Sequence, residues 1–172
     1  MYQPLASAPS ASRPVPRPAW LRLMREPLTA AERGALSAQR GAIRGSADVV
    51  ALLRDRACAE EVECFYVVSL NAKLRPVAIE EIARGTLTST VTTPREVLRL
   101  AVVVGAVSVI VAHNHPSGDP QPSPEDLALT RRLVAAGEVL GIPVVDHVIL
   151  ARGPEGGEAA FSFHDHGILP DA

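Results

Sequence analysis

The chain has 172 residues, of which 47% are hydrophobic, and a formal net charge of −2. This length suits one domain with a tail and excludes a TIM barrel of about 250 residues, while the apolar content excludes a disordered chain. Two cysteines are too few for a disulfide framework. The N-terminus lacks the apolar stretch of a signal peptide, and the longest apolar run, 100–112, is shorter than the about 20 residues of a membrane span. We therefore expect a cytoplasmic protein with no membrane partner.

The first 59 residues are predicted to form a leader followed by two short helices. Residues 1–28 are rich in proline, which fixes φ and lacks an N–H donor, so they predict a disordered leader. Thr29–Glu32 matches a capping box that opens a helix to about residue 40, and Ser46 starts a second helix that ends near Ala59. Residues 1–45 carry seven arginines against two glutamates, a net charge of +5. This basic arm gives weak support for a nucleic-acid partner, and a solvated tail is the simpler interpretation.

Residues 60–172 alternate between strand and helix signals, which predicts an α/β domain. The run 106–112 is apolar almost throughout, as is typical of a central strand covered on both faces. Pro94 opens a helix, and Gly105 ends it in the left-handed conformation. The expected strands are 64–70, 74–83, 86–93, 106–112, 143–150 and 159–163, the expected helices are 94–104 and 124–140, and a loop is expected over 113–122.

All five histidines follow residue 112, so we expect the chemistry in the last third of the chain. His113 and His115 come directly after the apolar run, and Asp126 lies in the first turn of the next helix. In extended geometry we expect the two imidazoles to diverge, whereas a strand that is ending turns both toward one ion. Two imidazoles and one carboxylate leave a position of tetrahedral Zn²⁺ open, as in a catalytic site. The hydroxyl of Ser123 is placed to donate to the oxyanion of a tetrahedral intermediate.

Each part of this pattern has a simpler explanation by itself. The run 123–126 (Ser-Pro-Glu-Asp) is a good helix start, with a serine N-cap, a proline at the first position and acids behind it. A lone His-x-His pair is a weak metal signal. The combination at the end of an apolar strand is what indicates a metal site. A zinc deaminase is disfavoured because Cys58 and Cys64 do not form a Cys-x-x-Cys pair, and no His-Glu-x-x-His motif is present.

The combined segment resembles the JAMM (MPN+) metallopeptidase motif. Its flanks, at 94–97, 112–118, 122–123 and 146–147, resemble the RadC family. The resemblance implies an α/β (α+β) domain over 60–172, in which a mixed β-sheet is flanked by helices as in cytidine deaminases. It also implies a zinc hydrolase that cuts peptide or isopeptide bonds. The residues that match the zinc ligands and serine of the family are His113, His115, Asp126 and Ser123.

The resemblance also implies a catalytic glutamate that precedes a strand early in the domain. Glu63, just before the strand that begins at Cys64, is the best match. Glu60 and Glu61 are so close in sequence to Glu63 that the catalytic glutamate of the family could match either of them instead. Glu80 or Glu81 is a weaker match. The alternative for Glu63 is an ordinary exposed acid at a strand start.

These implications favour a hydrolase that acts on a peptide or protein substrate. The alternatives are a non-catalytic binding module of the MPN fold and a DNA repair or recombination accessory protein. Longer RadC proteins carry a helix-hairpin-helix module, for which residues 1–45 are too short and too proline-rich, so direct DNA binding is less favoured. His147 is expected to be a buried histidine that orients the site, and His164 and His166 belong to a surface tail. The motif selects neither a particular amide nor an oligomeric state.

Overall fold

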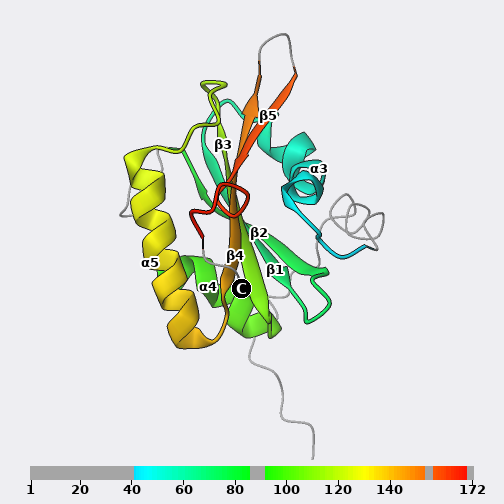
Figure 1. The fold of residues 1–172 in the computed structure, drawn as a ribbon, viewed down its shortest axis with the longest axis vertical. Coiled ribbons are helices and arrows are strands. Elements are labelled where there is room, and N and C mark those ends of the chain that lie inside the picture. Colours follow the sequence, from blue (N-terminus) through cyan, green and yellow to red (C-terminus); the bar gives the residue numbers. More distant parts are fainter. Residues whose placement is uncertain (1–40, 86–91, 154–156, 170–172) are drawn as a thin grey trace, which may run out of the picture.

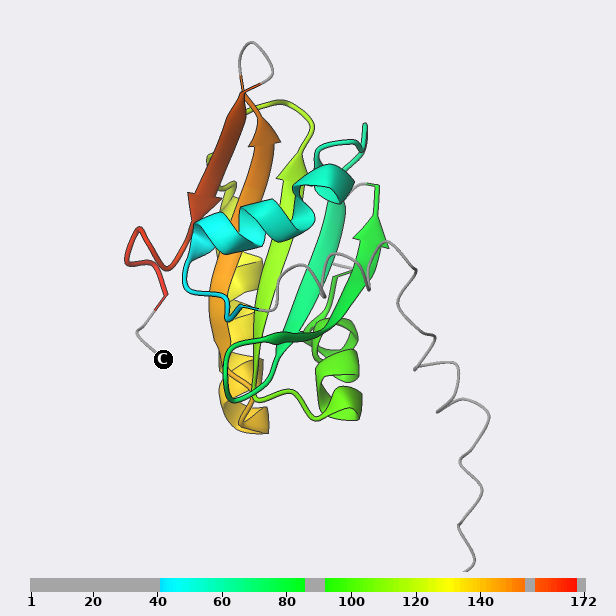
Figure 2. The ribbon, with the colours of Figure 1, turned by 90° about the vertical axis from the view of Figure 1, so that its right-hand side faces the viewer.

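The computed structural model describes residues 41–85, 92–153 and 157–169. Within these ranges, a five-stranded sheet in the order β2-β1-β3-β4-β5 is covered by helix α3 on one face and by helices α4 and α5 on the other (Figures 1 and 2). The predicted α/β fold, a mixed sheet flanked by helices, is confirmed. The elements in chain order are α3 (Ser46–Ala57), β1 (Cys64–Leu70), β2 (Pro76–Arg84), α4 (Pro94–Val104), β3 (Ser108–His115), α5 (Pro124–Leu140), β4 (Val144–Arg152) and β5 (Glu158–Ser162).

Strand β3 is the middle of the sheet. It pairs antiparallel with β1 and parallel with β4, and seven of its eight residues are buried. A strand with partners on both edges and helices on both faces has no access to water, which explains the continuous apolar run that predicted it. β2 and β5 are the two edge strands, as expected for β5.

Proline and glycine set the ends of α4 and α5, as the sequence indicates. Each helix has proline at its first position, and a glycine with φ of 67° ends it, Gly105 for α4 and Gly141 for α5. This φ lies in the left-handed region that glycine adopts without steric cost. The start of α5 matters most, because it carries Asp126 toward the end of β3.

The two faces of the sheet bury two different cores. From β1, Tyr66 and Val68 pack toward α3, whereas Phe65 and Val67 pack toward α4 and α5. β3 alternates in the same way, with Ile110 on the α3 face. Successive strand residues point to opposite faces. The even-numbered residues of β3 therefore lie on the α3 face, and the odd-numbered residues lie on the face of α4 and α5.

Several predicted boundaries are wrong or lie outside the described residues. The loop predicted from residue 113 starts later, because β3 continues through His115 while still paired with β4. The return strand starts at Pro76 rather than at residue 74, because Leu74, with φ of 54°, still belongs to the turn. Of the strand predicted over 86–93, residues 86–91 are not described, and Thr93 is the N-cap of α4 instead. The predicted leader and the helix over 29–40 also lie outside the described residues.

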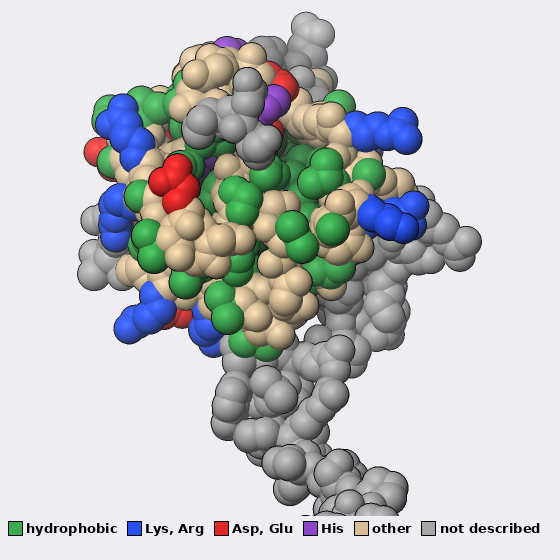
Figure 3. Space-filling model, turned by 60° about the horizontal axis from the view of Figure 1, so that its bottom comes forward, with side chains coloured by type: hydrophobic (Ala, Val, Ile, Leu, Met, Phe, Trp, Pro, Cys, Tyr) green, Lys and Arg blue, Asp and Glu red, His purple; other side chains and the backbone are tan. Residues whose placement is uncertain are grey.

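The two ends of the sheet differ in character. The end where α4 and α5 finish presents a group of hydrophobic side chains (Figure 3), among them the exposed Val102, Val107, Val139 and Leu140. The opposite end, where β3 finishes, carries the histidines. In the described ranges, no helix has the length and apolar character needed to cross a membrane.

Candidate metal centre

Three side chains that the sequence singled out converge at the end of β3. The Nε2 atoms of His113 and His115 are 3.0 Å apart, and Nε2 of His113 lies 3.2 Å from Oδ1 of Asp126. Nε2 of His115 lies 3.6 Å from Oδ2 of the same carboxylate. The expectation that extended geometry separates the two rings is wrong, because residues i and i+2 of a strand lie on the same face. The regular strand itself brings the histidines together.

The capping box of α5 fixes the orientation of the Asp126 carboxylate. Both the backbone N–H and the hydroxyl of Ser123 donate to Oδ2 of Asp126, at 2.8 and 2.6 Å. In return, Oγ of Ser123 accepts from the backbone N–H of Asp126 at 3.1 Å. Oδ1 therefore remains to face His113. The helix cap and the predicted ligand are one arrangement, in which the cap holds the ligand in place.

A chain of buried hydrogen bonds fixes the proton on His113. The hydroxyl of Thr130 donates to the backbone carbonyl of Asp126 at 2.6 Å, so toward Nδ1 of His147, also at 2.6 Å, it acts as acceptor. Nδ1 of His147 then carries the proton, and Nε2 of His147 accepts from Nδ1 of His113 at 2.8 Å. Burial lowers the pKa of His147 well below its usual value, so this ring stays neutral. The lone pair of His113 is thereby placed on Nε2, toward Asp126.

His115 has the same tautomer by a shorter route. Its Nδ1 lies 2.7 Å from the backbone carbonyl of Asp119, which can only accept, so Nδ1 donates. Each histidine thus uses one ring nitrogen as a donor and turns the other, unprotonated, to the common point. Metal-binding histidines in proteins are oriented in this way. Two imidazole lone pairs and a carboxylate oxygen repel one another unless a cation or a proton lies between them, so this donor set fits a metal ion.

The electrostatics of the group agree with this assignment. Burial raises the pKa of Asp126, but the hydrogen bonds that His113 and then His115 donate in their protonated forms outweigh it and hold that pKa well below its usual range. The hydrogen bond with Asp126 raises the pKa of His115, and the negative charge of Glu63 adds to this effect. The carboxylate is therefore ionised, and a proton and a metal ion compete for the same face of His115.

Glu63 comes just before β1, close in sequence to the strand end that faces the histidines. Phe65 of β1 pairs with His113 of the antiparallel β3, and Glu63 precedes Phe65 by two residues. The ring of Phe65 stacks on that of His113. The charge of Glu63 is felt at His115, as described above. Glu63 therefore stays the predicted catalytic glutamate.

The other glutamates considered from the sequence face elsewhere. The carboxylate of Glu60 binds Arg84 at 2.5 and 2.9 Å. Glu81 binds the same arginine at 2.8 Å, and Glu80 lies 3.4 Å from Arg99. Their charges are engaged with arginines rather than with the histidines. Glu61 is exposed and lines the pocket described next.

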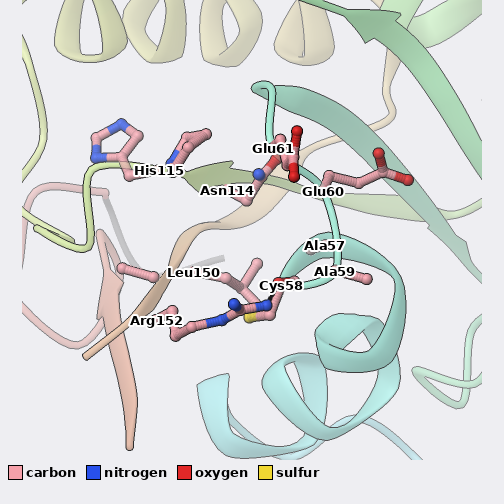
Figure 4. A pocket seen from close by; sticks show the side chains of 11 residues that line it. Ala57, Cys58, Ala59, Glu60, Glu61, Asn114, His115, Leu150 and Arg152 are labelled. Carbon is pink, nitrogen blue, oxygen red and sulfur yellow. Dashed lines mark hydrogen bonds between the residues drawn. The ribbon is translucent and has the colours of Figure 1, made fainter. Parts of the chain in front are cut away.

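A pocket of about 310 Å³ opens next to His115. Figure 4 shows its wall, formed by the segment that follows α3 with Glu60 and Glu61 on one side and by Arg152 at the end of β4 on another. A guanidinium N–H of Arg152 donates to the backbone carbonyl of Cys58 and so ties β4 to that segment. Of the three converging residues, His115 is the one that lines this pocket.

The sequence analysis missed Thr130, which is buried and completes the chain of hydrogen bonds. It lies four residues after Asp126 on α5, so helical periodicity was a usable signal that both side chains share a face. His147 lies where it was expected, fully buried, and its ring stacks on Phe163 at 4.6 Å. His164 and His166, expected in a surface tail, are exposed and outside the convergent group.

The sheet order, the histidine pair at the end of its central strand and the aspartate at the start of the next helix define a JAB/MPN-type α/β domain with a candidate metal centre. A family model described as a RadC-like JAB domain matches residues 43–168. The chain belongs to the RadC family.

Relatives from several bacteria agree with this assignment. The UPF0758 protein STH371 of Symbiobacterium thermophilum is 45% identical over 121 residues, which are 70% of this chain and 50% of the relative. The UPF0758 protein of Rubrobacter xylanophilus is 45% identical over 130 residues, 76% of this chain and 55% of its own length. UPF0758 protein TTE0897 of Caldanaerobacter subterraneus is 49% identical over 106 residues, which are 62% of this chain and 46% of the relative. The chain thus spans about half the length of the curated relatives it matches.

Proposed function

We propose that this domain is a zinc-dependent hydrolase of peptide or isopeptide bonds. The observation that carries the proposal is the convergence of two imidazole nitrogens on one carboxylate, with the far nitrogen of each ring engaged as a donor. His113, His115 and Asp126 would hold the ion. Three protein ligands are the set found at catalytic zinc sites, whereas structural sites use four. When bound, zinc acidifies water from a pKa of about 15.7 toward about 7 and polarises a carbonyl.

The chain's own residues supply the proton transfers. Hydrolysis adds water across the amide C–N bond, so the water must lose a proton and the leaving amine must gain one. Glu63, whose charge is felt at His115, is the proposed base that takes this proton and then gives it to the amine. General acid–base help of this kind contributes about 10²- to 10⁴-fold in rate. The pocket beside His115 is the proposed path for the amide.

Ser123 is proposed to donate to the oxyanion that develops on the carbonyl. Its hydroxyl already donates to Asp126 at 2.6 Å. To reach the substrate, the hydroxyl must therefore rotate away from that carboxylate, while the backbone N–H of Ser123 keeps Asp126 in place. A hydrogen-bond donor to the oxyanion is worth about 10²- to 10³-fold in rate.

A matched pair of glutamate variants tests the proposal. The zinc-loaded chain is assayed against a library of short peptides and lysine isopeptide conjugates, together with Glu63→Gln and Glu138→Gln. Glu63→Gln is expected to keep one zinc per chain and to lose activity about 10²- to 10⁴-fold, because only its proton transfer is removed. Glu138→Gln changes an exposed carboxylate near the C-terminal end of α5, outside the pocket, and is expected to retain activity. Wild-type turnover by Glu63→Gln, or no cleavage of any amide by the wild type, would contradict the proposal.

A further inference from the structure

Asn114 lies between the two proposed ligands and faces the other way. Because side chains alternate along a strand, His113 and His115 share one face of β3 while Asn114 lies on the α3 face. Asn114 is buried, with 2% of its surface exposed. Figure 4 shows it beside His115, with its side chain directed toward the segment that carries Glu60 and Glu61. A buried carboxamide needs a hydrogen-bond acceptor for its NH₂ group and a hydrogen-bond donor for its oxygen.

Those partners are the two peptide groups on either side of Glu63. Nδ2 of Asn114 donates to the backbone carbonyl of Val62 at 2.9 Å, and Oδ1 accepts from the backbone N–H of Cys64 at 2.7 Å. A carbonyl can only accept and an N–H can only donate, so only one orientation of the amide satisfies both bonds. The side chain therefore brackets Glu63 through its backbone.

This bracket stands where the ordinary strand ladder stops. The pairing of β1 with β3 ends at Phe65 and His113, and β1 itself begins at Cys64. The peptide groups before that point are held to β3 by the Asn114 side chain instead. On its other side, the backbone carbonyl of Glu63 accepts from the N–H of Gly85 at 2.8 Å. Three hydrogen bonds thus fix the backbone from Val62 to Cys64 in relation to β2 and β3.

We propose that Asn114 is the positioning residue for Glu63. Three consecutive residues of β3, 113–115, then have two roles in the proposed site. The first and third side chains would hold the metal ion, and the middle side chain, Asn114, sets the distance between the base and that ion. This inference rests on the proposed function, in which Glu63 moves the proton. A displacement of about 1 Å between reacting groups can cost about 10²-fold in rate, so the bracket matters to turnover through the position of Glu63.

The test compares two asparagines whose side chains bind backbone groups at opposite ends of β1. Asn114→Asp keeps the size and the acceptor but loses the donor to Val62, and Asn114→Ala removes both. Asn71 is the matched control, because its Oδ1 accepts from the backbone N–H groups of Lys73 and Arg75 at 2.9 and 3.2 Å in the turn at the far end of the strand. All variants are made in the full chain, loaded with zinc and checked for one zinc per chain.

The expected result is a loss in kcat of about 10- to 100-fold for Asn114→Asp, with KM changed by less than about twofold, while Asn71→Ala keeps the wild-type kcat. In the Glu63→Gln background, Asn114→Asp should cost nothing more, because it acts through the glutamate. Equal losses in both backgrounds, or equal losses from the two asparagines, would overturn the inference and leave Asn114 as a structural anchor.

A second readout is independent of turnover. Amide hydrogen exchange at Cys64 should accelerate at least about tenfold in Asn114→Ala and stay at the wild-type rate in Asn71→Ala, because only Asn114→Ala removes the acceptor of that N–H. Unchanged protection at Cys64 would overturn the positioning inference alone. A wild-type chain that cleaves no amide would instead overturn the proposed function, whatever the exchange shows.

Discussion

The domain contains two His-x-His segments, and only one of them forms a convergent group. His113 and His115 lie in β3, where regular pairing on both sides holds their side chains on one face. The second segment, 164–166, follows β5, where the chain has left the sheet. There, Nδ1 of His164 lies 3.6 Å from the carboxylate of Asp165, whereas His166 stacks on Phe161 with ring centres 3.9 Å apart. The same pattern of residues thus gives two different structures.

The difference teaches what a histidine pair needs to become a candidate metal centre. In β3 a third candidate ligand arrives from α5, and the far nitrogen of each ring is engaged in a hydrogen bond. In the second segment the middle residue, Asp165, turns away and accepts from the hydroxyl of Ser46 at 2.6 Å. That carboxylate therefore ties the tail to α3. Convergence depends on strand geometry, on a ligand from another element and on a donor network, and spacing alone supplies none of these.

Removing ligands should separate the two segments most strongly. His113→Ala and Asp126→Ala are each expected to lose stoichiometric zinc, since each leaves two ligands where a zinc site in a protein uses at least three. The double variant His164→Ala/His166→Ala is expected to keep one zinc per chain. Zinc is measured by elemental analysis after dialysis against a weak chelator. Full occupancy in Asp126→Ala, or loss of zinc from the tail variant, would reverse the comparison.

Breaking the donor network should give a smaller effect on the same site. Thr130→Val keeps the shape of the side chain but gives the proton on His147 no acceptor, so the tautomer of His113 is no longer fixed. Loss of such a partner behind a ligand typically weakens metal binding by about 10- to 100-fold. Thr130→Ser restores the hydroxyl and is expected to bind zinc as the wild type does, in competition titrations with a chromophoric chelator. A Thr130→Val affinity within twofold of the wild type would show that the network is incidental.

Most of the fold follows from signals that are local in the sequence. The starts and ends of α4 and α5 follow from proline at the first turn and glycine in the left-handed conformation, and apolar β-branched runs indicate β1, β3 and β4. The end of β3 was misjudged because His113 and Asn114 are polar, which ordinarily marks a loop. They remain in the strand because their partners on β1 and β4 come from parts of the chain more than 30 residues away.

The candidate site is predictable to the same extent. The ligand types and the spacing to Asp126 are local, and so is the capping box that orients its carboxylate. The roles of Thr130 and Asn114 require knowing which strands are neighbours and which face each side chain takes. The family resemblance already favoured Glu63 over its neighbours, whereas its place relative to the histidines depends on the pairing of β1 with β3. Register and facing are tertiary properties, so the sequence indicated the ligands but not what positions them.

The pH dependence of zinc binding should distinguish the convergent group from exposed histidines. The hydrogen bond with Asp126 raises the pKa of His115 above its usual value of about 6.5, so a proton competes with zinc up to a higher pH than at a free imidazole. The pKa of Asp126 lies far below this range, so its charge stays constant. Affinity is expected to be level above the raised pKa and to fall about tenfold per pH unit below it for each proton displaced. Chelator competition between pH 5.5 and 8.5 measures this, and a decline confined to pH below 6 would contradict it.

The smallest effect is expected where the second segment touches α3. Ser46→Ala removes the hydroxyl that donates to Asp165, and that hydrogen bond is exposed. Water replaces such a bond readily, so the free energy of unfolding should fall by less than about 1 kcal/mol. Asp55→Asn, at a carboxylate that is 97% exposed, is the control for a surface change on the same helix. Both variants should keep one zinc per chain, measured beside urea unfolding. A loss of zinc from Ser46→Ala would mean that the tail supports the metal centre through Asp146, which accepts from the backbone N–H groups of both His147 and His164.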